Sequence, residues 1–258
     1  MNKRQLTGIL LILLFLPLSS NAQSWKLRRY EASVSLCTSQ IYGDIGGSAD
    51  ANNLYGLKDI QILKTRPSVA FGARYKIDER MAVKVNLIFG MVSGNDEKSR
   101  NDDRNFSFTS TIIEPSAQFE YYLISERKSV SSGASFSRRG MINNFGKLYP
   151  YVFAGVGGII SNPKLLRNDV PVILDESISK FGLTFPLGIG IKTSLNSKVS
   201  LGFEFGRRFT TTDNIDGYTS EWSKANDLYD IGMFSLIYKI PTDRRGRPIL
   251  GKATRFRR

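Results

Sequence analysis

The chain has 258 residues, a formal net charge of +13 and no histidine. It contains one cysteine, Cys37, and therefore no internal disulfide. The lack of histidine excludes Ser-His-Asp and Cys-His nucleophiles, histidine bases and zinc sites that need histidine. We therefore predict a protein that is not an enzyme and has no catalytic residue, cofactor or metal. We expect Cys37 to be a small interior side chain of the first strand.

The first 22 residues have the pattern of a secretory signal peptide. Lys3 and Arg4 form a positive start, residues 6–18 are apolar, and small residues precede Gln23. The apolar run is shorter than the about 20 residues that a membrane-spanning helix needs. We predict a signal peptide over residues 1–22, an outer-membrane domain over residues 23–240 and a basic periplasmic tail over residues 241–258. The predicted location is the outer membrane of a Gram-negative bacterium.

Eight segments alternate large apolar residues with small or polar ones, which predicts β-strands. In chain order they are residues 30–41, 67–77, 81–92, 106–123, 149–160, 183–191, 199–205 and 227–240. The apolar positions of the last segment change parity between Ile231 and Phe234, so we expect a β-bulge near Met233. In the fifth segment, Gly155 and Gly157 predict places where a bulky neighbour approaches the backbone.

The number of strands and their connections favour a transmembrane barrel. Eight is an even number, and a tilted strand crosses a bilayer with about 9–11 residues. Two-residue turns join the second strand to the third and the sixth to the seventh, whereas residues 42–66, 93–105, 161–180 and 210–226 form longer loops. This alternation is typical of outer-membrane barrels, although residues 124–148 are too long for a short turn. A soluble barrel or a β-sandwich is the alternative.

The second face of the segments decides between these folds because it carries charges of both signs. An eight-stranded barrel has an interior just wide enough for side chains, which paired acids and bases can fill. We therefore predict an all-β, eight-stranded antiparallel transmembrane β-barrel whose apolar face, including Leu183 to Phe205, contacts outer-membrane lipid. The predicted interior charge network consists of Glu31, Arg74, Lys84, Glu114, Glu120, Lys192, Glu204 and Arg208.

Positive charge gathers in three segments that this topology places on the periplasmic side, residues 24–29, 124–148 and 241–258. Without Lys3 and Arg4 the formal charge is +11, and these three segments alone sum to +13. We call the following ten residues the basic rim: Arg127, Lys128, Arg138, Arg139, Arg244, Arg245, Arg247, Arg255, Arg257 and Arg258. Either the tail is disordered and solvated, or the rim contacts an acidic periplasmic protein or anionic lipid. No nucleic-acid-binding motif accompanies the charge, so we expect no nucleic-acid partner.

Short motifs spread over residues 30–240 carry a family resemblance. They are Tyr42-Gly43-Asp44-Ile45, Arg104-Asn105-Phe106-Ser107-Phe108, Glu114, Glu120, Tyr149-Pro150-Tyr151, Gly155-Val156-Gly157, Phe185-Pro186-Leu187-Gly188-Ile189-Gly190 and Thr212-Asp213. Together they resemble a Bacteroidetes outer-membrane β-barrel family that includes PorG, a component of type IX secretion and gliding machinery. More distantly, the architecture is similar to the OmpA and OmpX barrels. The resemblance implies a barrel that serves a secretion or motility assembly.

Three functions follow from these observations. The first is a non-enzymatic barrel that anchors or guides an envelope assembly, of the type IX secretion or gliding kind, from its periplasmic side. The second is a narrow pore or a ligand-binding barrel, and interior ion pairs disfavour conduction. The third is a small lipid-modifying enzyme, which the lack of histidine disfavours. Asp96, Asp102 and Asp103 lack the spacing of a calcium loop, so we expect no cation there.

Overall fold

The computed structural model describes residues 28–43, 45–46, 65–97, 99, 102–125, 134–137, 140–143, 148–173, 180–218, 226–243 and 246–249. The predicted signal peptide, residues 1–22, lies outside them. In this part of the chain, no helix has both the length and the apolar character needed to cross a membrane.

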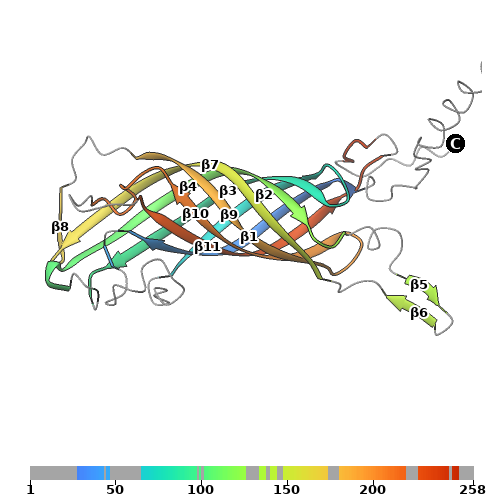
Figure 1. The fold of residues 1–258 in the computed structure, drawn as a ribbon, viewed down its shortest axis with the longest axis horizontal. Coiled ribbons are helices and arrows are strands. Elements are labelled where there is room, and N and C mark those ends of the chain that lie inside the picture. The colour runs from blue at the N-terminus through green and yellow to red at the C-terminus, as the bar shows by residue number, and fades with distance from the viewer. Residues whose placement is uncertain are drawn as a thin grey trace, which may run out of the picture.

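Eight long strands form one closed antiparallel barrel (Figure 1). Each strand pairs with its neighbours in the order β4-β3-β2-β1-β11-β10-β9-β7, and pairing of β4 with β7 closes the ring. The predicted fold class is therefore confirmed. The strands are β1 Tyr30–Tyr42, β2 Arg66–Lys76, β3 Met81–Asn95, β4 Phe106–Tyr122, β7 Leu148–Arg167, β9 Phe181–Ser194, β10 Val199–Thr210 and β11 Leu228–Ile240.

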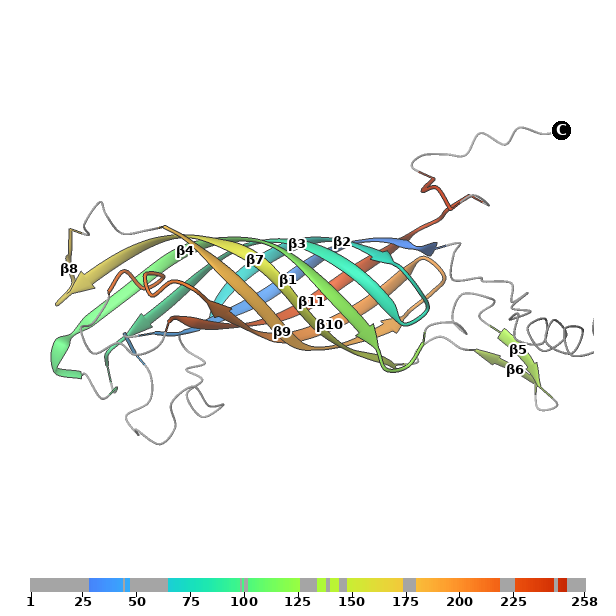
Figure 2. The ribbon, with the colours of Figure 1, turned by 45° about the horizontal axis from the view of Figure 1, so that its top comes forward.

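Short elements lie at the two ends of the barrel. Strands β5 (Ala134–Ser137) and β6 (Gly140–Asn143) pair in a separate two-stranded sheet inside the long connection between β4 and β7. Strand β8 (Val170–Pro171) pairs with the last residues of β7, and a short 3-10 helix, η5, covers Asp102–Arg104. Figures 1 and 2 place β5 and β6 beyond one end of the barrel and β8 at the other.

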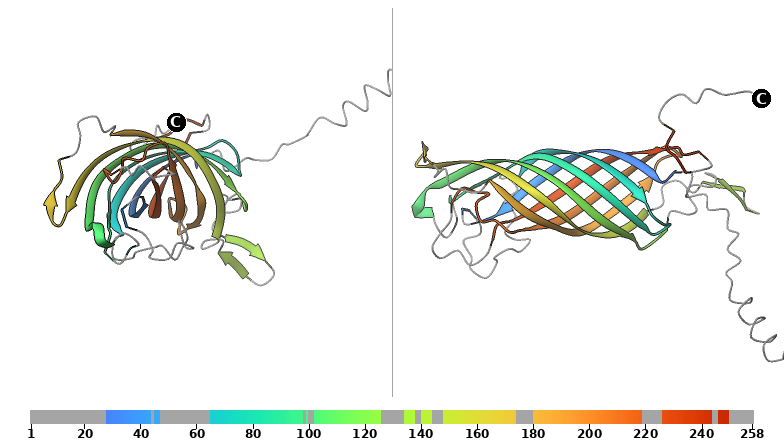
Figure 3. Two further views of the ribbon diagram at one scale, coloured as in Figure 1. Left: turned by 60° about the vertical axis from the view of Figure 1, so that its left-hand side comes forward. Right: turned by 90° about the horizontal axis from the view of Figure 1, so that it is seen from above.

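We name the two ends of the barrel by their connections. At the turn end, residues 77–80 and 195–198 join neighbouring strands, β1 begins and β11 finishes. At the loop end, longer connections join β1 to β2, β3 to β4, β7 to β9 and β10 to β11. Figure 3 shows the strands running between these ends at a tilt to the barrel axis, as closure of a barrel requires. In outer-membrane barrels the short turns lie on the periplasmic side.

Strand β7 is longer than the sequence predicted. Beyond Ile160, the predicted end, it continues to Arg167, and residues 161–167 pair with residues 106–112 of β4. Pro163 lies in this extension. Here β7 pairs with β4 on one edge but no longer with β9 on the other, because the pairing of β7 with β9 ends at Ile160 and Phe181. A proline is tolerated at such an edge because it has no N–H to donate to a ladder.

The predicted β-bulge near Met233 is wrong. Residues 228–240 of β11 pair in unbroken register with β1, with Met233 opposite Cys37, and the register with β10 is equally continuous. Tyr229, Ile231 and Met233 are buried inside the barrel, whereas Phe234 is exposed on its outside. The parity of apolar residues changes because the interior itself becomes apolar toward the loop end.

The outside of the barrel is a continuous apolar surface. Leu183, Phe185, Leu187, Ile189, Ile191, Phe203 and Phe205 are all exposed, together with outward residues of every other barrel strand, such as Leu36, Phe71, Val85, Phe119, Val152 and Leu236. A closed barrel leaves no free sheet edge, so its backbone can be satisfied in a bilayer, where this apolar surface contacts lipid. Cys37, in contrast, is buried inside, which confirms the expectation for it.

Because the outside of the barrel is apolar, a charged residue placed halfway along a strand on that side should strongly destabilise the folded barrel. Leu187 lies near the middle of β9 and is 56% exposed. We expect Leu187→Arg to destabilise the folded barrel in phosphatidylcholine vesicles by about 2–4 kcal/mol, measured by urea refolding titration.

The matched control is Ile173→Arg, at a loop-end residue that is 97% exposed and beyond the strands. It should leave the titration unchanged. Gly217, in the loop between β10 and β11, is unsuitable as a control because it is buried and has a φ of 78°. If arginine at Leu187 and arginine at Ile173 lowered the unfolding free energy equally, the assignment of Leu187 to the lipid-facing side would be contradicted.

Candidate functional site

Glycines in the wall let large rings lie inside the narrow barrel. Tyr151 and Phe153 point inward from β7 and are buried. A Cβ atom at Gly190 would lie 2.3 Å from Cζ of Tyr151, and one at Gly206 would lie 2.6 Å from Cζ of Phe153. Gly155 and Gly157 instead face the backbone of β4, since their Cβ atoms would meet carbonyl oxygens of Ala117 and Pro115. The predicted bulky neighbours therefore occur at other glycines, on β9 and β10.

Glu31 forms ion pairs with three cationic side chains in the half of the barrel near the turn end. Its carboxylate lies 3.0 Å from Nη1 of Arg74, 2.9 Å from Nζ of Lys76 and 2.7 Å from Nζ of Lys192. These residues come from β1, β2 and β9, and all of them are buried. Alternation directs them inward, and the small diameter of the barrel brings side chains from strands that are not neighbours within hydrogen-bonding distance.

Arg74 links Glu31 to the acids of two further strands. Its Nε lies 2.7 Å from Oε2 of Glu120, and its Nη2 lies 3.4 Å from Oε1 of Glu204. Lys84 and the hydroxyl of Tyr151 both donate to the same oxygen of Glu204, the latter over 2.6 Å. Six of the eight predicted interior residues are thus joined in one cluster, which we call the interior network: Glu31, Arg74, Lys84, Glu120, Lys192 and Glu204.

The other two predicted residues form a separate pair closer to the loop end. Nε of Arg208 lies 3.6 Å from Oε2 of Glu114, and the hydroxyl of Tyr229 donates to the same carboxylate oxygen over 2.8 Å. Arg208 also donates to the carbonyl oxygen of Gly206. This pair is buried, but its partners differ from those of the interior network.

Two interior lysines were missing from the predicted set. Lys76 is next to Arg74 on the inward face of β2, and Lys239 donates to the hydroxyl of Ser194 over 2.7 Å. The same alternation that identified the other residues could have found both. With them, five buried lysines and arginines face three buried glutamates in the described interior of the turn-end half. The interior near the turn end is therefore cationic on balance.

The loop end of the interior is closed by apolar side chains, a feature that the sequence did not reveal. Ile41, Val92, Phe108, Ile112, Leu165 and Ile231 of the strands pack with Ile45 and Ile215 of two loops, and we call this cluster the outer plug. Asp96 fixes the first loop by accepting from the N–H of Gly46 over 3.0 Å while it pairs with Arg104. Asp227 fixes the second by accepting from the N–H of Ile215 over 2.9 Å.

Only one residue of the basic rim, Arg247, lies among the described residues. It is exposed in a tight turn that follows β11, where the N–H of Asp243 donates to its carbonyl oxygen over 2.9 Å. Gly246 has a φ of 78°, and Thr242 pairs with Pro248. The described residues between 241 and 249 thus form a turn, and the choice between a solvated tail and a docking rim stays a prediction. The other nine residues of the basic rim lie outside the described residues.

These features define a class of protein. A closed barrel with an apolar outside, a side-chain-filled interior and alternating short turns and long loops is an outer-membrane β-barrel. The predicted location in the outer membrane is thereby confirmed. The chain belongs to the family described as Domain of unknown function (DUF6089), which matches residues 9–234.

Several solved structures are similar to this chain. OprG of Pseudomonas aeruginosa is 10% identical, with a TM-score of 0.42 over 83% of this chain and 97% of its own. Neisserial surface protein A is 10% identical, with a TM-score of 0.40 over 81% and 96%. The outer-membrane enzyme PagL is 14% identical, with a TM-score of 0.32 over 81% and 99%. No curated protein matches the chain in sequence.

The interior network predicts strong coupling between Lys84 and Glu204. Glu204→Gln removes the carboxylate that pairs with the buried ammonium of Lys84, whereas Lys84→Met leaves Glu204 with Arg74 and Tyr151. The first change should destabilise the barrel by about 3–5 kcal/mol, and the second should destabilise it by less. The loss of unfolding free energy in the double variant should be smaller than the sum of the two single losses by a coupling energy of about 0.5–3 kcal/mol, because both charges are removed together. Urea titration in vesicles measures all three values.

Lys198→Gln serves as the control, since Lys198 is exposed in the turn between β9 and β10. It should stay within about 0.5 kcal/mol of the unchanged protein. Strictly additive costs for Lys84 and Glu204 would show that the two side chains do not interact.

Proposed function

We propose that this protein is a closed, non-enzymatic anchor in the outer membrane, which docks an acidic periplasmic protein of an envelope assembly at its turn end. The assembly would be of the kind that drives type IX secretion or gliding. The observation that supports the proposal is the charge of the turn end. Its described cations are Arg28, Arg29, Arg80, Lys198 and Arg247, against the acids Asp78, Glu79 and Asp243.

The connectivity of the chain adds further positive charge to this end. Residues 126–147 leave β4 and return to β7 at the turn end, and residues 250–258 follow the turn after β11. Both segments carry members of the basic rim. Since short turns face the periplasm in outer-membrane barrels, this charge is available to a periplasmic protein.

The proposed contact is electrostatic, and this determines how it should respond to salt. Single exposed ion pairs contribute little, but a surface of one sign steers an oppositely charged partner and fixes its orientation. Such a contact weakens as the Debye length falls from about 10 Å at 0.1 M salt to about 3 Å at 1 M.

The test is co-purification from membranes after mild cross-linking. Replacing Arg244, Arg245, Arg247, Arg255, Arg257 and Arg258 together by glutamine should abolish recovery of an acidic periplasmic partner at low salt, without affecting heat-modifiable folding. Raising the salt concentration should have the same effect on the unchanged protein.

A matched control neutralises six cations of the loop end: Lys58, Lys64, Lys98, Arg100, Lys164 and Lys180. This variant should recover the partner as well as the unchanged protein does. If the partner is recovered equally from both six-residue variants, the basic rim has no docking role and the proposal fails.

A narrow pore is the second candidate function, and the filling of the interior argues against it. The interior network and the outer plug occupy two successive levels of the barrel. We therefore expect no stepwise conductance when the purified barrel is added to planar bilayers, under conditions in which a general porin conducts. Discrete channels that persist in independent preparations would favour the pore instead.

A further inference from the structure

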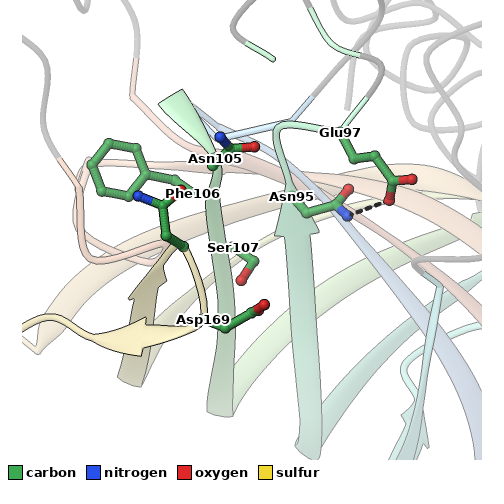
Figure 4. A pocket seen from close by; sticks show the side chains of 7 residues that line it. Asn95, Glu97, Asn105, Phe106, Ser107 and Asp169 are labelled. Carbon is green, nitrogen blue, oxygen red and sulfur yellow. Dashed lines mark hydrogen bonds between the residues drawn. The ribbon is translucent and has the colours of Figure 1, made fainter. Parts of the chain in front are cut away.

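A polar hollow at the loop end has no part in the proposed docking. Its volume is about 470 Å³, and its described lining consists of Asn95, Glu97, Asn105, Phe106, Ser107, Asn168 and Asp169. These residues come from the end of β3, the start of β4 and the turn between β7 and β8. Figure 4 shows Asn95 and Glu97 on one side of the hollow, Phe106 on the other, and Ser107 between them. We call it the outer hollow.

The outer hollow lies at the loop-end rim of the wall, beyond the apolar surface. Ser107 pairs with Asn95, and on β4 the odd-numbered residues Ser107, Thr109 and Thr111 alternate with buried Phe108 and Ser110. These outward residues are polar, whereas the outward residues farther along β4, such as Phe119, are apolar. A ligand therefore reaches the outer hollow from the aqueous phase at the loop end.

The walls of the outer hollow are held in place. The N–H of Asn168 donates to the carbonyl oxygen of Asn105 over 3.1 Å, and the N–H of Asp96 donates to that of Phe106 over 2.9 Å. The guanidinium of Arg167 lies 5.3 Å from the ring centre of Phe106, and that of Arg104 lies 5.9 Å away. A binding surface that is already ordered costs less conformational entropy when a ligand binds.

The backbone at the outer hollow adopts a rare conformation. Asn105, Asn168 and Asp169 have φ values of 51°, 50° and 63°, and they are the three non-glycine residues with positive φ in the described chain. Asn168 and Asp169 are the two central residues of the tight hairpin that joins Arg167 to Val170, a turn that needs positive φ at both positions and that asparagine and aspartate tolerate. The lining is therefore built partly from a short, well-defined hairpin.

The chemistry of the lining selects the class of ligand. Two carboxylates accept hydrogen bonds, while three carboxamides and a hydroxyl both donate and accept them. Arg104 and Arg167 lie beside the lining, over the ring of Phe106, but Arg104 is paired with Asp96, so the carboxylates of Glu97 and Asp169 leave no excess of positive charge for an anionic ligand. A bare cation would leave the amide donors unused and most of the volume empty. A ring that carries many hydroxyl groups satisfies both donors and acceptors.

We propose that the outer hollow binds a neutral carbohydrate presented on the outer side of the membrane. Its volume falls within the roughly 300–1,000 Å³ of small-molecule sites and accommodates one or two sugar rings. Carboxylate acceptors and amides with both donor and acceptor atoms recognise sugar hydroxyls by direct hydrogen bonds.

The test uses the full mature barrel in detergent and a panel of neutral saccharides, namely glucose, galactose, mannose, N-acetylglucosamine and their disaccharides. Binding is detected by saturation-transfer NMR, and the affinity of the best ligand is then titrated. Ser107→Trp, which fills the outer hollow, should weaken that affinity by at least about tenfold. Asp169→Asn keeps a residue that tolerates positive φ and should weaken it about three- to tenfold.

Thr109→Trp is the matched control, two residues away on the same strand and the same exposed face, outside the lining. It should bind the saccharide as the unchanged protein does, and circular dichroism checks that all variants fold. The proposal is overturned if no saccharide of the panel binds, or if Ser107→Trp binds with unchanged affinity. It is also overturned if the outer hollow responds to calcium chloride alone, which would make it a cation site.

Discussion

The structure depends on one spatial constraint: an eight-stranded barrel has an interior only as wide as the side chains that fill it. Every inward position must therefore match the positions across the barrel in size and in charge. The turn-end half meets this requirement with Glu31, Arg74 and Glu204 at the centre of a set of ion pairs. The loop-end half meets it with apolar side chains, two of which come from loops.

The interior network has a greater effect on register than on net stability. Removing charges from water costs several kcal/mol for each ion, and the ion pairs compensate for this cost only in the correct geometry. A slip of one residue along a strand would turn its charges toward lipid and its leucines inward. Buried pairs between strands that are far apart in the ring, such as Glu31 with Lys192, therefore penalise wrong pairings of several strands at once.

Alternation of residues explains how much the sequence could predict. A period of two marks the wall strands and assigns each side chain to one of two faces, so the eight strands and the inward direction of the charged residues follow from the sequence alone. The period-two rule failed where a strand carries apolar side chains on both its inward and its outward face. At Tyr229, Ile231 and Met233 it suggested a bulge, although the register is unbroken. The outer plug depends on loops whose backbone N–H groups donate hydrogen bonds to the carboxylates of Asp96 and Asp227, and such contacts between distant residues leave no periodic pattern.

Two of the prolines in the barrel strands, Pro115 of β4 and Pro186 of β9, have a consequence for the stability of the wall. Pairing of β7 with β4 is interrupted opposite Pro115, and pairing with β9 is interrupted opposite Pro186, although the register on either side is kept. The two interruptions are close together on β7, in the stretch from Gly155 to Ile159: pairing with β9 is missing at Gly155 and Val156, and pairing with β4 is missing at Gly158 and Ile159. Amide protons of this stretch will exchange with solvent deuterium earlier than those at equal depth elsewhere in the wall. Local opening of the wall is therefore expected to begin at this stretch of β7, where the ladder hydrogen bonds are fewest.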